Sequence, residues 1–102
     1  MKLIKAVIRP FKLEEVKDAL IEIGVKWMTV IEAKSFGGYH VSANFVPKII
    51  IEVIVPDELL SVTVKVICRT AKTGKSGDGK ILILSLEDAI RIRTEERGDE
   101  AI

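Results

Sequence analysis

Hydrophobic and polar residues alternate at the start of the chain and then recur at helical spacing. Residues 2–9 place Ile4, Ala6 and Ile8 on one face of a predicted strand, which Pro10 ends. Residues 12–23 follow as an amphipathic helix, and Gly24 stops it. The apolar stripe of this helix consists of Leu13, Val16, Leu20 and Ile23.

Three further strands are predicted from apolar segments bounded by turn residues. They cover about 27–36, which Gly37 and Gly38 break, then 48–55, and finally the run that begins at Ile81. The segment 48–55 is apolar enough to be central in a sheet. The residues after Pro56 are ambiguous, because 61–66 alternate like a strand and are rich in β-branched side chains.

An internal repeat decides this ambiguity in favour of a helix. The pattern that surrounds Pro10 recurs 46 residues later around Pro56. The repeat predicts a helix from Asp57 to about Lys72. Leu59, Val62 and Val66 are the repeat counterparts of Leu13, Val16 and Leu20, so they are predicted to form the buried stripe of the second helix.

The predicted order is β-α-β-β-α-β in a single domain, residues 1–102. This order is typical of the ferredoxin-like α+β fold, a sandwich in which one face of an antiparallel four-stranded sheet carries both helices. The strands are apolar on both faces, so the uncovered face is expected to pack against copies of itself.

Composition and charge exclude several classes of function. The 102 residues are 48% hydrophobic and carry a net charge of +1, so no basic field favours nucleic acid. The N-terminus is too short and too charged for a signal or a membrane span, which predicts a cytoplasmic protein without membrane insertion. Cys68 and His40 are single, so we expect neither a disulfide nor a catalytic or metal site, and Cys68 is predicted to lie in the core.

The stretch TGKSGDGK, residues 73–80, has the glycine and lysine spacing of a P-loop in Gly74, Gly79 and Lys80. A P-loop continues with Ser or Thr and a helix, whereas Ile81 here begins a strand, so the P-loop NTPase interpretation is rejected. Two interpretations remain open, namely a loop that holds phosphate by other means and an ordinary glycine turn.

A short basic run, Arg91-Ile92-Arg93, follows the last strand. We expect this run to be extended, so that alternation places both guanidinium groups on one side, where they suit phosphate or carboxylate. The alternative is a solvated edge strand with ordinary surface charge. Residues 94–102 are predicted to be a solvated C-terminal tail.

Taken together, these motifs resemble the PII signal-transduction family over nearly the whole chain. The likeness lies in KAVIRPFKLEEVKDALIEIG at the start, FVPKIIIEVIVPDE at 45–58, AKTGKSGDGK at 71–80 and the closing RIRTEERGDEAI. The resemblance implies a homotrimer that binds ATP or ADP in clefts between subunits, with Mg²⁺ as a companion of ATP. It also implies a sensor of energy and nitrogen status rather than an enzyme, with an ammonium transporter or nitrogen-metabolism enzymes as targets.

The resemblance also implies the residues of the nucleotide site. The phosphate loop would include Gly77, Asp78, Gly79 and Lys80, while Arg91 and Arg93 would reach the phosphates from the next subunit. Lys48 matches a lysine that contacts 2-oxoglutarate in the family. The remaining nucleotide-binding positions are Thr29, Gly37, Gly38, Glu52, Ile54 and Thr73.

The segment about 37–47 departs from the family, which usually carries a long exposed loop here. Only a short segment remains, with Gly38 at the place of an arginine and Tyr39 at the place of a glutamine. Partner docking, covalent modification and 2-oxoglutarate binding therefore do not follow from the resemblance. A structural trimeric module that has lost nucleotide-dependent signalling is the alternative function.

Overall fold

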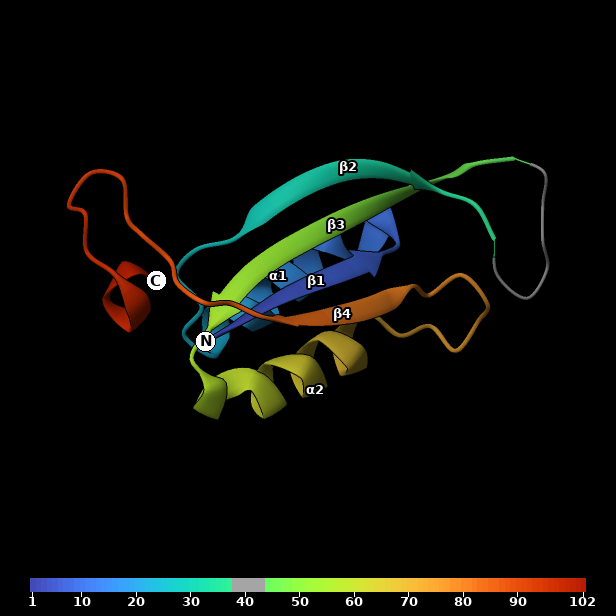
Figure 1. Cartoon of the computed structure of the whole chain (residues 1–102). Coiled ribbons are helices and arrows are strands. Elements are labelled where there is room, and N and C mark those ends of the chain that lie inside the picture. The colour runs from blue at the N-terminus through green and yellow to red at the C-terminus, as the bar shows by residue number, and fades with distance from the viewer. Residues whose placement is uncertain (38–43) are drawn as a thin grey trace.

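The computed structural model describes residues 1–37 and 44–102, and it confirms the predicted order of elements (Figure 1). Single 3₁₀ turns, Pro10–Lys12 and Asp57–Leu59, lead into the two helices, and a third 3₁₀ turn, Gly98–Ala101, lies near the C-terminus. The helices and strands are β1 Lys2–Ile8, α1 Leu13–Glu22, β2 Thr29–Ser35, β3 Val46–Val55, α2 Leu60–Ala71 and β4 Lys80–Ser85.

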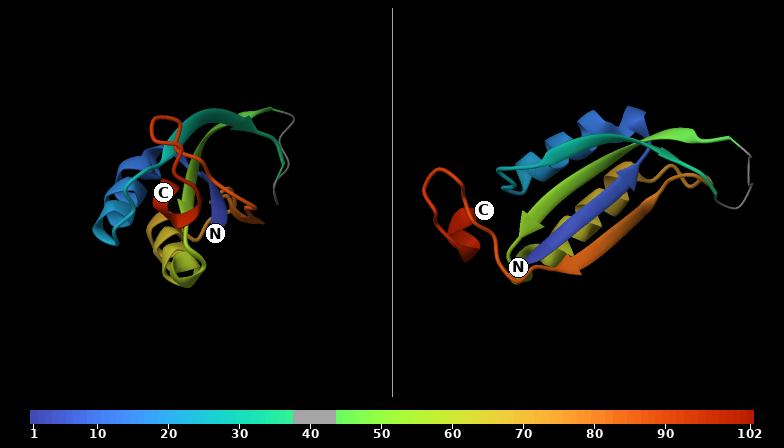
Figure 2. Two further views of the ribbon diagram at one scale, coloured as in Figure 1. Left: turned by 60° about the vertical axis from the view of Figure 1, so that its left-hand side comes forward. Right: turned by 45° about the horizontal axis from the view of Figure 1, so that its top comes forward.

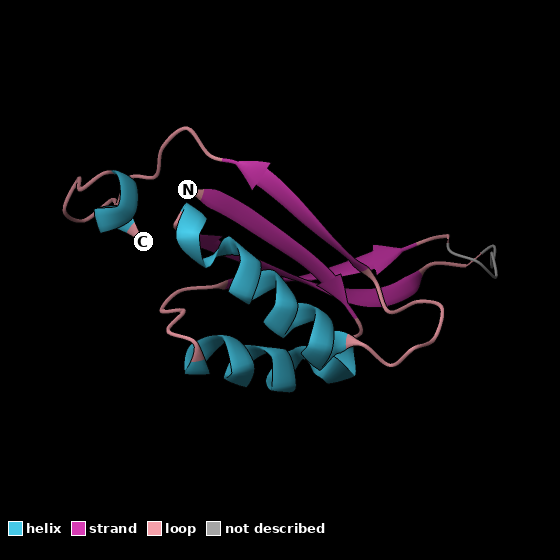
Figure 3. Ribbon diagram, turned by 90° about the horizontal axis from the view of Figure 1, so that it is seen from below, coloured by secondary structure: helices cyan, strands magenta, loops and turns pink. Residues whose placement is uncertain are grey.

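The four strands form one antiparallel sheet in the order β2-β3-β1-β4. Both helices cover the same face of it, as Figure 3 shows from below. This arrangement confirms the ferredoxin-like α+β fold that the sequence predicts. No helix in the described ranges is long and apolar enough to cross a membrane.

The core lies between the sheet and the two helices. Alternate residues of β1, namely Ile4, Ala6 and Ile8, are buried there, and Val16 and Leu20 of α1 pack against them. Burial of each large aliphatic side chain stabilises the fold by about 1.5–3 kcal/mol. The predicted stripe of the first helix is thus confirmed at its centre.

The predicted stripe of the second helix is wrong at its first two positions. Val62 is 40% exposed, whereas its repeat counterpart Val16 is fully buried, and Leu59 is exposed as well. The helix presents Thr63 to the core instead, because the Thr63 hydroxyl donates to the Leu59 carbonyl at 2.7 Å and so enters the interior satisfied. The buried residues of α2 are Thr63, Val66, Ile67 and Ala71.

Cys68 also differs from its prediction, because its side chain is exposed rather than in the core. It directly follows Ile67, which is buried, and successive residues of a helix point in directions about 100° apart. The rotation of α2 that buries Thr63 and Ile67 therefore turns Cys68 toward the helix margin.

The second face of the sheet has no helix on it. The strand register places Leu3, Lys5 and Val7 of β1 on this face, opposite even-numbered residues of β3. Lys5 and Glu52 form an ion pair across it, with Nζ and Oε2 at 3.4 Å. The register also puts Thr29, Lys48 and Lys80 on this face, and the apolar side chains there include Ile31, Ile50, Ile54, Leu82 and Leu84.

The C-terminal residues fold into a small hairpin beyond one end of the sheet (Figures 1 and 2). Ile90 and Arg97 form an isolated antiparallel bridge, and the 3₁₀ turn follows. Residues 94–102 are largely exposed, as the prediction of a solvated tail requires, and they also contain the 3₁₀ turn. Asp88 organises them by accepting hydrogen bonds from the amides of Ala89, at 2.8 Å, and Gly98, at 3.1 Å.

Candidate functional site

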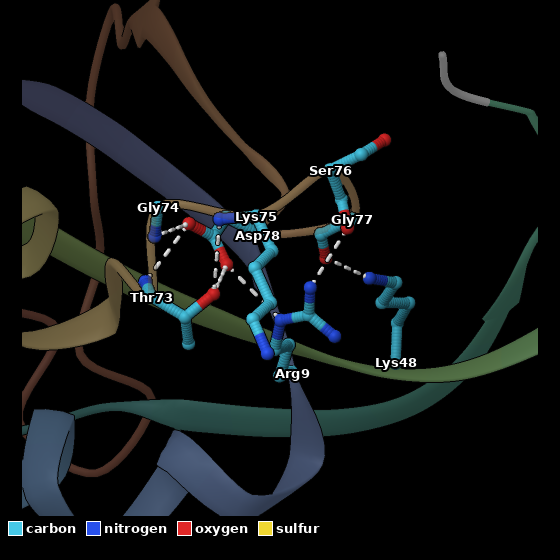
Figure 4. Close-up of polar contacts among 8 residues, drawn as sticks. All are labelled: Arg9, Lys48, Thr73, Gly74, Lys75, Ser76, Gly77 and Asp78. Atoms are coloured by element: carbon cyan, nitrogen blue, oxygen red, sulfur yellow. Dashed lines mark hydrogen bonds and ion pairs between the residues drawn. The ribbon is translucent and has the colours of Figure 1, made fainter. Parts of the chain in front are cut away.

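The loop between α2 and β4 is built around the carboxylate of Asp78 (Figure 4). The Thr73 and Gly74 amides donate to its Oδ2, each at 2.8 Å, and the Thr73 hydroxyl donates to its Oδ1. Arg9 Nε donates to the same Oδ1 at 3.0 Å. These four hydrogen bonds close residues 73–78 into one ring of contacts.

The same hydrogen bonds keep Asp78 ionised. The Thr73 hydroxyl is the largest cause that holds the pKa of Asp78 well below its ordinary value, and the Thr73 amide, Arg9 and the Gly74 amide add to it. Both carboxylate oxygens are engaged within the loop. Asp78 therefore shapes the predicted phosphate loop, since its carboxylate is engaged within the protein and its amide donates to the Lys75 carbonyl at 3.3 Å.

Two glycines make the loop possible. Gly79 has a φ of +107°, and a Cβ at this position would lie 1.7 Å from the Val7 carbonyl oxygen of β1. Gly77 has a φ of +98° and a Cβ there would lie 3.2 Å from an Arg9 nitrogen. The backbone thus approaches β1 closely at Gly79, and Lys80 follows as the first residue of β4. The predicted strand after the loop is confirmed.

Arg9 is the residue of this site that the sequence analysis missed. Besides Asp78, its guanidinium donates to the Ser76 carbonyl at 2.8 Å. A sequence signal was present, because the internal repeat has the buried Val55 where the first half has Arg9. A charged residue at a repeat position whose counterpart is apolar indicates a specific polar contact in that half of the chain.

Lys48, the predicted 2-oxoglutarate contact, lies beside the same loop (Figure 4). Its ammonium group donates to the Gly77 carbonyl, and the residue is only 8% exposed. Burial, followed by repulsion from Arg9, lowers the pKa of Lys48, while Asp78 raises it. Two cations thus face one carboxylate, and an added anion would relieve their repulsion.

Three of the predicted nucleotide-binding residues lie on the uncovered face of the sheet. Thr29 of β2 pairs directly with Glu52 of β3, so their side chains point to the same side. Ile54 follows two residues later on this face, and Glu52 forms its ion pair with Lys5. The structure therefore brings Thr29, Glu52 and Ile54 together.

Arg91 and Arg93 lie in the C-terminal hairpin, at the opposite end of the sheet from the glycine loop (Figure 1). The prediction that the run is extended is wrong, because Ile92 to Thr94 form a turn with Ile92 at its tip, 96% exposed. Arg91 forms an ion pair with Glu96, with Nη1 and Oε1 at 3.3 Å. Both arginines line a hollow together with Trp27 and Ile54. One chain does not bring these arginines to Gly77–Lys80.

Some predicted residues contribute less to this picture. Gly37 has a φ of +118° and open space around it, at the end of the described segment that follows β2. Gly38 and Tyr39 lie outside the described residues. Within 1–37 and 44–102, no group of three or more His, Cys, Asp or Glu side chains could hold a metal ion.

Comparison with known proteins gives a consistent picture. The family model described as nitrogen regulatory protein P-II matches residues 1–96. A nitrogen regulatory protein P-II of Rhodospirillum rubrum is 47% identical over 112 aligned positions, and one of Rhodobacter capsulatus is 45% identical over the same length. Nitrogen regulatory protein P-II 1 of Escherichia coli is 46% identical. Each alignment covers 100% of this chain and 100% of the relative.

Proposed function

The chain belongs to the nitrogen regulatory protein P-II family, and from this membership we propose that it binds ATP or ADP in clefts between the subunits of a homotrimer. The bound nucleotide would report energy and nitrogen status to target proteins. The family's regulatory role in signal transduction makes the protein a sensor, and the proposal assigns it no reaction of its own.

The observation that carries this proposal is the shape of the loop at residues 73–80. The four hydrogen bonds to Asp78 hold the loop before any ligand arrives, and Gly77 and Gly79 keep side chains away from the backbone. The Gly77 N–H, which no hydrogen bond among the described residues uses, is left for an anion, and Lys80 adds a positive charge at the edge of the loop.

The separation of the two basic parts supports a site shared between subunits. The glycine loop and the Arg91–Arg93 hairpin lie at opposite ends of the sheet in one chain (Figure 1). A nucleotide that contacts both would therefore take them from two chains. The apolar residues on the uncovered face offer the surface through which such chains would associate.

The described residues also suit Mg²⁺ as a companion of ATP rather than as a resident ion. Mg²⁺ keeps several waters and is commonly bound through substrate phosphates and few protein ligands. The described part of the chain has no cluster of acidic ligands of its own. The ion, when bound, would reduce the repulsion among the phosphates.

Calorimetric titration with ATP, ADP and AMP tests the proposal. We expect a dissociation constant near micromolar for ATP or ADP, which corresponds to about −8 kcal/mol. Lys80→Ala should weaken ATP binding at least tenfold. Lys75→Ala is the matched control, because it removes a lysine of the same loop that is not among the predicted site residues. No measurable heat with any nucleotide would favour the alternative, a trimeric module without nucleotide-dependent signalling.

The same titration tests the response to 2-oxoglutarate. We propose that the response is weak, because Tyr39 stands where the family has a glutamine, and a phenol is a poorer ligand for a hard cation than an amide oxygen. Lys48 alone, already bonded to Gly77, offers a single ion pair. Tightening of MgATP binding by tenfold or more on addition of 2-oxoglutarate would overturn this part of the proposal.

The difference in length supports a shortened loop. The alignments with relatives span 112 positions, whereas this chain has 102 residues, so each alignment contains positions that the chain lacks. We place these missing positions in the segment 37–47, where the family usually carries a long loop. Partners that dock through this loop in longer relatives would meet a smaller surface here.

A further inference from the structure

Arg9 occupies a fixed position at the end of β1, directly below the glycine loop. The pairing of Ile8 with Ile49 holds the strand to its last residue, and Pro10 restricts Arg9 to an extended conformation, with φ −66° and ψ 137°. The side chain is largely covered, being 24% exposed. The strand pairing and Pro10 thus fix the backbone from which the Arg9 side chain extends, and the surrounding residues cover most of that side chain.

The guanidinium contacts the loop at two separate points. Its Nε donates to Asp78 Oδ1 at 3.0 Å, and a terminal nitrogen donates to the Ser76 carbonyl at 2.8 Å (Figure 4). A planar fork can make two such bonds in fixed directions, which a lysine ammonium cannot reproduce. Arg9 therefore fixes the direction of a peptide group as well as the place of a carboxylate.

The direction of that peptide group determines where the loop amides point. The carbonyl and the N–H of one trans peptide lie on opposite sides of the chain, so the Ser76 carbonyl that faces Arg9 turns the Gly77 N–H away from it. The Gly77 carbonyl likewise faces Lys48. None of the hydrogen bonds among the described residues uses the Gly77 N–H. It is left for an acceptor outside the loop.

We propose that Arg9 is a positioning residue for the nucleotide site: it holds the Ser76 carbonyl and Asp78 so that the Gly77 amide faces the phosphates. This inference rests on the proposed nucleotide binding and adds to it a residue that touches no part of the ligand. The loop is then set from β1, and not only by its own glycines.

Three variants separate positioning from charge. Arg9→Ala removes both contacts with the loop. Arg9→Lys keeps the charge but loses the fork. Lys12→Ala is the matched control, because it removes a neighbouring cation that pairs with Glu15, at 3.4 Å, and makes no hydrogen bond to the loop.

Amide hydrogen exchange without nucleotide gives the first measurement. The Thr73 and Gly74 amides donate to Asp78, so their exchange reports on the closed loop. Arg9→Ala should accelerate exchange at both amides at least tenfold, Arg9→Lys nearly as much, and Lys12→Ala not at all. Exchange in the middle of β1 should be the same in all three variants.

Nucleotide affinity gives the second measurement. Arg9→Ala and Arg9→Lys should both weaken ATP binding at least tenfold, which is about 1.4 kcal/mol, while the affinity for adenosine stays the same. Full rescue by Arg9→Lys, or unchanged loop exchange in Arg9→Ala, would overturn the inference. If the unaltered protein binds no nucleotide, the proposed function fails, and with it the ligand half of the inference, while the exchange rates still decide whether Arg9 holds the loop.

Discussion

Gly79 is the residue at which the backbone of the loop comes nearest to the sheet. A methyl group there would lie 1.7 Å from the Val7 carbonyl oxygen and 2.8 Å from the Val7 carbonyl carbon, neither of which can move without disturbing β1. The neighbouring Gly74 also has a positive φ, +87°, but has open space around it. A side chain at Gly74 would strain only the backbone conformation, whereas a side chain at Gly79 would also clash with β1.

We predict that Gly79→Ala destabilises the protein considerably more than Gly74→Ala. Gly74→Ala should cost about 1–2 kcal/mol, because only the backbone conformation is strained. Gly79→Ala should cost about 2–5 kcal/mol, because the clash with β1 adds to that strain. Urea unfolding of both variants measures the difference. Equal losses would mean that β1 and β4 separate easily at this point.

Asp78 leads to a prediction about pH. Its pKa is lower in the folded protein than its ordinary value of 3.8, so the ionised group stabilises the fold above that value and the contribution is lost as the pH falls. The difference in unfolding free energy between the unaltered protein and Asp78→Asn should therefore be constant above about pH 5 and shrink progressively below it. Urea titrations across this range provide the measurement. A difference that grew on acidification would contradict the assigned hydrogen bonds.

Among the elements, the C-terminal hairpin is held by backbone hydrogen bonds, from the Arg91 amide to the Glu96 carbonyl and from the Gly98 amide to the Ala89 carbonyl, each at 3.0 Å, and by the carboxylate of Asp88. Asp88 accepts from the Ala89 and Gly98 amides and from Arg97 at 2.8 Å, and Arg97 is the largest cause of its lowered pKa. The hairpin carries Arg91 and Arg93, so its order determines where their charges lie. Asp88 itself is not among the predicted nucleotide contacts.

We predict that Asp88→Ala opens the hairpin and weakens ATP binding severalfold while leaving the sheet intact. Asp88→Asn is the control, because it keeps an oxygen for the two amides and loses only the ion pair with Arg97. Amide exchange at Gly98 and calorimetry with ATP measure the two effects. Unchanged affinity in a variant whose Gly98 amide exchanges freely would show that the arginines do not need the hairpin.

The sequence was sufficient for the elements but not for their rotation or for the details of the site. Apolar spacing and the repeat predicted all six helices and strands, because both patterns report local geometry. The repeat failed at Val62, since two similar helices need not turn the same side toward the core. The run that contains Arg91 and Arg93 was expected to be extended, and this expectation failed because alternation over only three residues does not exclude a turn. The role of Arg9 could not be predicted, because its hydrogen-bond partners Ser76 and Asp78 are distant from it in sequence.

At the scale of the whole molecule, the proposal assigns the two halves of the nucleotide site to different chains. Gly77 to Lys80 would come from one subunit, and Arg91 and Arg93 from its neighbour. We predict that chains with Lys80→Ala and chains with Arg91→Ala/Arg93→Ala, each inactive alone, regain part of their ATP binding when mixed in one trimer. The reason is that some clefts of a mixed trimer combine two unaltered halves.

The experiment requires subunits to exchange, for example by joint refolding, and light scattering confirms that trimers form. Calorimetry on the mixture then counts the restored sites. Each variant refolded separately is the control. If mixing restores no binding while trimers form, the site lies within one chain, and a stable monomer at micromolar concentration would contradict the proposed assembly itself.

The order of the sheet also bears on how the chain folds as it leaves the ribosome. β1 is synthesised first, yet it pairs with β3 on one side and β4 on the other, joining Lys2 to Val55 and to Ser85. A nascent chain therefore displays an unpaired, apolar strand until most of the protein has emerged. Closing such distant contacts is slow. The sheet can be completed only after β4 has emerged, and until its partners arrive β1 is exposed to chaperones and to other nascent chains.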